Sequence, residues 1–132
     1  MKSLSLVIAA MMFMHAVPAS AGACRPIEYA ELKDTATEIV VERYCRYRAL
    51  FYVEDAYYLK LLEINEKRLR LYRKPGLSDG TAKDLERDLA DGKAEREATL
   101  ASMDGCIDQQ AKMQTVLKSR GLDEPNCPER YR

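Results

Sequence analysis

The stretch from Ile27 to Lys74 contains 48 residues without a glycine or a proline. Proline is favoured at the first position of a helix, and proline or glycine is common just after its end. Pro26 precedes the stretch and Pro75-Gly76 follows it. The sequence therefore predicts one long helix over residues 27–74, which ends at a tight turn.

The first 21 residues have the three parts of a secretory signal peptide. Lys2 is the charged start, residues 4–17 form the apolar core, and Ala19-Ser20-Ala21 is a small-residue cleavage site. The apolar run is shorter than the ~20 residues that span a bilayer. We therefore expect residues 1–21 to be removed, and residues 22–132 to form one helical domain in the periplasm or outside the cell.

A competing cleavage position lies just before Cys24. The residues Ala21-Gly22-Ala23-Cys24 resemble a lipoprotein motif, although Ala21 stands where a large aliphatic residue is usual. Lipidation of Cys24 would leave an odd number of cysteines for disulfide formation. A lipid-anchored protein is therefore the less favoured alternative.

Catalytic chemistry has little support in this sequence. His15 is the only histidine, and it lies in the predicted signal peptide. Nucleophiles activated by histidine and zinc sites that need histidine are thereby excluded from the mature chain. Phosphate-binding glycine loops, acidic calcium loops and nucleophile elbows do not occur. We expect no enzymatic activity, no cofactor and no metal, and the formal net charge of 0 argues against nucleic-acid binding.

Four cysteines in an exported chain predict two disulfides. Cys24 and Cys45 are 21 residues apart, as are Cys106 and Cys127, and the four positions are symmetric about Pro75-Gly76. Residues equally far from the turn of an antiparallel helical hairpin lie opposite one another. The spacing therefore predicts the pairs Cys24–Cys127 and Cys45–Cys106. Cys24–Cys45 would lie too far apart along one helix, and Cys24–Cys106 would join opposite regions of the hairpin.

The second helix is predicted from Thr81 to Arg120. Thr81 and Asp84 resemble a capping box, and Gly121 is a typical C-terminal stop. Gly92 costs about 1 kcal/mol relative to alanine inside a helix, which predicts a bend or short break there. The predicted fold class is all-α: a long antiparallel, coiled-coil-like helical hairpin stapled by two disulfides.

The first helix has two apolar sides at a rotation of about 100° per residue. The smaller side chains on one side are Val41, Cys45, Ala49, Tyr52, Ala56 and Leu59. If Cys45 is bonded to Cys106, the second helix covers that side and leaves the aromatic side uncovered. The residues predicted on this basis to bind a protein are Tyr44, Tyr47, Phe51, Tyr58 and Leu61. Burial of these rings as ordinary core is the alternative.

We therefore expect a protein-binding, accessory or assembly module of the bacterial cell envelope. The partner is either a second copy of the chain or another protein, since tyrosine is enriched at both kinds of interface. An inhibitor of an exported enzyme is a related alternative. A membrane-surface protein is the alternative from another class, because residues 67–74 are basic.

Overall fold

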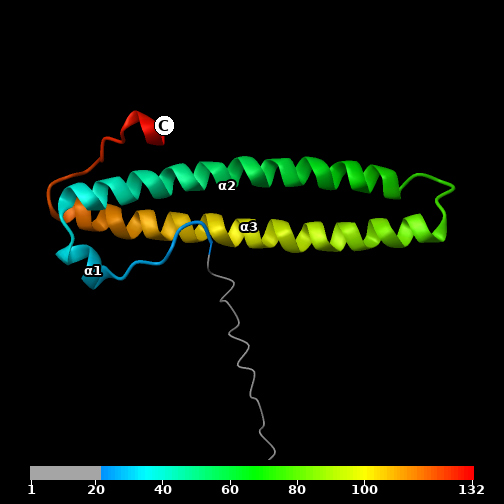
Figure 1. Ribbon diagram of the computed structural model, residues 1–132, viewed down its shortest axis with the longest axis horizontal. Helices are drawn as coiled ribbons and strands as arrows, with labels where there is room; N and C mark the ends of the chain where they lie inside the picture. Colours follow the sequence, from blue (N-terminus) through cyan, green and yellow to red (C-terminus); the bar gives the residue numbers. More distant parts are fainter. Residues whose placement is uncertain (1–21) are drawn as a thin grey trace, which may run out of the picture.

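The computed structural model describes residues 22–132, and in that range every regular element is a helix. The helices are α1 (Tyr29–Asp34), α2 (Thr37–Tyr72), α3 (Asp79–Ser119) and the 3-10 turn η1 (Glu129–Tyr131). α2 and α3 run antiparallel and pack along each other, which confirms the predicted helical hairpin (Figure 1). The predicted signal peptide, residues 1–21, lies outside the described residues.

The hairpin turn lies where Pro75-Gly76 predicts it. Gly76 has φ = +82°, a left-handed conformation that glycine adopts without the steric cost of a Cβ atom. The hydroxyl of Ser78 accepts a 3.3 Å hydrogen bond from the Thr81 N–H and caps α3. α3 therefore begins two residues before the predicted cap at Thr81, and it ends at Ser119.

The prediction of one helix over residues 27–74 is wrong, because the chain is extended at Thr35 and Ala36 between α1 and α2. The Thr35 hydroxyl donates a 2.7 Å hydrogen bond to the Glu31 carbonyl. The guanidinium of Arg120 donates to the carbonyls of Leu32, Lys33 and Thr35 at 2.8–3.0 Å. A side chain 85 or more residues away thus satisfies the carbonyls that a continuous helix would have bonded internally.

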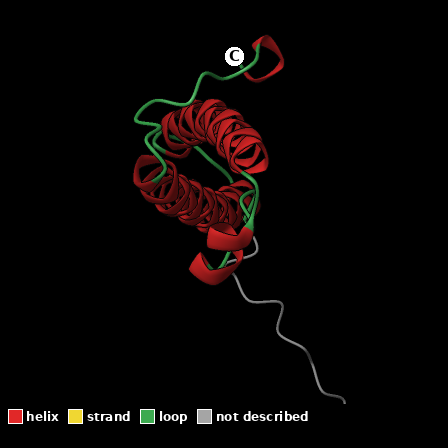
Figure 2. Ribbon diagram, turned by 90° about the vertical axis from the view of Figure 1, so that its left-hand side faces the viewer, coloured by secondary structure: helices red, strands yellow, loops and turns green. Residues whose placement is uncertain are grey.

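The break allows the N-terminal segment to reverse direction. Residues 22–28 run back along α3 (Figure 1), and the Ile27 N–H donates a 2.9 Å hydrogen bond to Oε1 of Gln109. Near the C-terminus of the chain, Gly121 has φ = +82°, and the segment after it crosses to α2. The two terminal segments thus lie on opposite sides of the hairpin (Figure 2).

All four cysteines are bonded, but the predicted pairing is wrong. The disulfides join Cys24 to Cys106 and Cys45 to Cys127, with Cα–Cα distances of 4.9 Å and 5.4 Å. The symmetric spacing would give the predicted pairs only if both helices continued to the outer cysteines. Because the chain reverses before α2 and again after α3, at the end of the hairpin away from the turn, each outer cysteine reaches the inner cysteine of the opposite helix.

The hydrophobic core lies at the disulfide-bonded end of the hairpin, where α1 and residues 22–28 add a third layer to α2 and α3. Leu32, Val40, Met113 and Leu117 are fully buried there. The part of the hairpin nearer the turn consists of two helices alone, and α3 continues through Gly92 without the predicted short break. A Cβ atom on Gly92 would lie 3.1 Å from Nη1 of Arg68, so the glycine leaves room for that side chain.

Candidate protein-binding surface

The aromatic side of α2 faces α3, so the prediction that it points away is wrong. Tyr47 and Leu61 are buried, each 7% exposed, and Tyr44 and Phe51 pack against the core. Tyr58 is half-buried. This orientation agrees with the disulfide pairing. Cys45 is bonded to Cys127 in the C-terminal segment, so the side of α2 that carries Cys45 faces that segment and not α3. A protein-binding role for these five residues stays a prediction.

The opposite side of α2 carries the exposed apolar residues instead. Tyr52, Val53 and Leu59 are 57%, 65% and 58% exposed. Together with Ala49 and Ala56 they form a stripe at helical spacing, which we call the Tyr52 surface. Sequence reasoning noted most of these residues but placed them under the second helix, because the wrong disulfide pairing fixed the wrong orientation.

Other exposed aromatic side chains on α2 have hydrogen-bonding partners on α3. The Tyr57 hydroxyl donates to the carboxylate of Glu95, and the Tyr72 hydroxyl donates to that of Glu86 at 2.8 Å. These bonds raise the pKa of both tyrosines. Both rings therefore help to hold the two helices together, whereas the exposed Tyr52 ring points to solvent.

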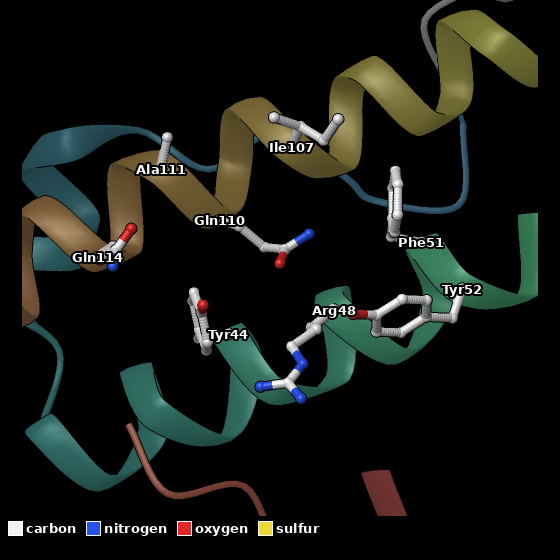
Figure 3. Close-up of a pocket in the computed structure, with 8 residues that line it drawn as sticks. All are labelled: Tyr44, Arg48, Phe51, Tyr52, Ile107, Gln110, Ala111 and Gln114. Atoms are coloured by element: carbon white, nitrogen blue, oxygen red, sulfur yellow. The ribbon is translucent and has the colours of Figure 1, made fainter. Parts of the chain in front are cut away.

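A groove of about 450 Å³ lies beside Tyr52 between the two long helices. Tyr44, Arg48, Phe51 and Tyr52 contribute from α2, and Ile107, Gln110, Ala111 and Gln114 contribute from α3 (Figure 3). The rings of Phe51 and Tyr52 are edge-to-face, with centroids 5.6 Å apart. Two of the predicted residues, Tyr44 and Phe51, thus come together here.

A second cavity of about 390 Å³ lies on the other side of Tyr52, between α2 and the C-terminal segment. Its walls are Ala49, Tyr52, Val53 and Ala56 from α2, and Arg130, Tyr131 and Arg132 from the tail. The Cys45–Cys127 disulfide holds the tail in place. Arg130 and the Tyr131 hydroxyl also donate to Oε1 of Glu42, at 3.4 Å and 3.1 Å.

The charged residues that line the two cavities are all basic, although one of them, Arg130, is paired with Glu42 just outside. Arg48 lines the first cavity, Arg130 and Arg132 line the second, and no acidic residue in the described part of the chain lines either one. An apolar strip with a basic rim is complementary to a surface that carries apolar and acidic side chains.

Several other kinds of site find no support in residues 22–132. No three histidine, cysteine, aspartate or glutamate side chains in this range are grouped to hold a metal ion. None of the described helices is long and apolar enough to cross a bilayer.

The two disulfides indicate an oxidising compartment outside the cytoplasm, and Cys24 has no free thiol to accept a lipid.

Comparisons of the chain with protein-family models, with curated proteins and with solved structures found no match.

Proposed function

We propose that this chain is an exported helical binding module of the bacterial cell envelope, and that a segment of another protein docks on the Tyr52 surface. The observation that carries the proposal is the exposure of Tyr52, Val53 and Leu59 on one side of α2. Single exposed apolar residues are common on soluble proteins, but a continuous apolar strip is typical of an interaction site.

The two cavities define the chemistry of the partner. They flank Tyr52, so a partner segment that carries apolar side chains into both would enclose the tyrosine ring. Its carboxylates would then meet Arg48 and Arg132, since Arg130 is already paired with Glu42. Tyrosine and arginine are the residue types that most often dominate binding energy at interfaces, and charge pairs at the rim increase the rate of association.

The rigidity of the surface favours binding. Cys45–Cys127 fixes one wall of the second cavity, and Cys24–Cys106 fixes the layer behind the hairpin. A surface that is already ordered loses little conformational entropy when the partner docks. The same disulfides support a location in an oxidising compartment, and the predicted signal peptide supports export to the periplasm.

Site-specific photocrosslinking in the native host tests the proposal. A photoreactive residue replaces Val53 in one variant and Lys83, an exposed residue on α3, in the control. We expect a crosslinked product with a different protein from position 53 only. The double variant Arg48→Glu with Arg132→Glu should remove the product, whereas the matched pair Lys83→Glu with Arg87→Glu should leave it.

Two outcomes would contradict this proposal. Crosslinking that is equal at positions 53 and 83, or insensitive to the Arg48 and Arg132 substitutions, would mean that the Tyr52 surface is not the contact site. A product of twice the mass of the chain, together with a dimer in sedimentation equilibrium of the oxidised protein, would assign the surface to a second copy.

A further inference from the structure

A third cavity, of about 450 Å³, lies between the N-terminal segment and the start of the hairpin. It shares no lining residue with the two cavities of the Tyr52 surface. Its walls come from three elements: the N-terminal segment, α1 and α2. The lining residues are Arg25, Pro26, Ile27, Glu31, Arg43, Arg46 and Tyr47.

The lining contains three guanidinium groups and a single carboxylate. Glu31 is bonded to Arg43 at 2.9 Å, so this pair is neutral overall. Arg25 and Arg46 take part in no ion pair within residues 22–132, and both are exposed to solvent. Two positive charges at the wall of this cavity therefore lack a protein counter-charge in the described residues.

The backbone that carries Arg25 is held at several points. Its neighbour Cys24 is bonded to Cys106, and the Ile27 N–H donates to Gln109. The carbonyl of Arg25 itself accepts a 2.8 Å hydrogen bond from the Tyr47 hydroxyl. The segment is thus fixed against α2 and α3, so the start of the Arg25 side chain is positioned before any ligand arrives.

We infer that this cavity binds a small molecule with a doubly charged oxyanion group, of the phosphate monoester class. Guanidinium groups match phosphate oxygens in charge and in their two-pronged geometry, and Arg25 and Arg46 supply two positive charges for the two negative ones. The cavity is larger than a phosphate group, and the exposed Pro26 offers apolar surface to the rest of the molecule.

Isothermal titration calorimetry with phenyl phosphate tests the inference. At about pH 8 the probe is doubly charged, because the second pKa of a phosphate monoester is about 6. The oxidised full-length mature chain should bind it saturably. Arg46→Gln and Arg25→Gln should each weaken binding about tenfold, since each removes one charged hydrogen-bonding group. Both residues are exposed, so neither substitution disturbs the core.

Arg73→Gln is the matched control. Arg73 is also exposed and outside every described ion pair, but it lies at the far end of α2, so its loss should change the affinity less than about twofold. Inorganic phosphate and succinate complete the set: phosphate should bind more weakly than phenyl phosphate, and succinate more weakly still. The inference is overturned if phenyl phosphate gives no saturable heat, if Arg73→Gln weakens binding as much as Arg46→Gln, or if succinate binds tightest.

Discussion

The hydroxyl of Tyr47 donates a 2.8 Å hydrogen bond to the main-chain carbonyl of Arg25, a residue 22 positions earlier in the chain. The Tyr47 ring is buried in the core, where it packs with residues of α3. One side chain therefore joins the N-terminal segment to the hairpin. Tyr47, which the sequence suggests as a binding residue, supports the wall of the arginine-lined cavity.

Tyr47→Phe should lower the free energy of unfolding by about 1 kcal/mol, because it removes this hydrogen bond and keeps the ring. Urea denaturation followed by circular dichroism gives the value. Tyr52→Phe is the control, since Tyr52 is exposed. Equal stability of Tyr47→Phe and the natural protein would show that water replaces the lost bond at no cost.

Arg120→Met should lower the free energy of unfolding by about 3 kcal/mol. The guanidinium donates to three carbonyls near the α1–α2 junction and to the Thr37 hydroxyl, and charged hydrogen bonds are among the stronger ones. Hydrogen exchange should also accelerate in residues 29–37. Lys118→Met removes an exposed charge from the same end of α3 and should do neither. Faster hydrogen exchange that is confined to the C-terminus of α3 would contradict the role of Arg120 at the junction.

Gly105→Ala should stabilise the protein by about 1 kcal/mol, because alanine favours the helix and no other group lies within 4 Å of the added Cβ. Gly92→Ala should stabilise the protein less, since its Cβ would approach Arg68 to 3.1 Å. The difference between the two urea midpoints measures the cost of that contact. If Gly92→Ala gained as much as Gly105→Ala, Arg68 would be free to move aside.

Tyr57 should titrate above its ordinary pKa of 10.0, because its hydroxyl donates to Glu95 and ionisation would place two negative charges together. Since the folded-state pKa is the higher one, this contribution to stability is present below pH 10 and is lost as the pH rises through the folded-state value. The tyrosinate absorbance of the natural protein minus that of Tyr57→Phe isolates the group. In the Glu95→Ala background, the pKa of Tyr57 obtained from the same difference should move toward 10.0. An unchanged pKa there would rule out Glu95 as the cause.

Local signals in the sequence were sufficient to predict the main fold. Pro75-Gly76 marked the turn, the absence of glycine and proline marked most of α2, and the even number of cysteines predicted two disulfides. Each of these features depends on residues close together in the chain or on a simple count. The hairpin could therefore be predicted without any tertiary contact.

The errors in the extent of the first helix, in the disulfide pairing and in the orientation of α2 involve contacts between residues far apart in the chain. Arg120 satisfies the free carbonyls at the break near Thr35, and no local pattern reveals a partner so far along the chain. Without that break, Cys24 cannot reach Cys106, the pairing is wrong, and the orientation of α2 is reversed with it. For the same reason the sequence did not predict that the Tyr52 surface is exposed, although it grouped most of the residues of that surface on one side of the helix.

The two disulfides also determine what a protease can do to this protein. Each one joins a residue before the turn at 73–78 to a residue after it. A single cut in that exposed turn would therefore produce two fragments that remain covalently linked at two places. The nicked molecule would keep its mass apart from one added water, and a gel would separate the fragments only after reduction. The covalent connection between the two helices therefore does not depend on the turn.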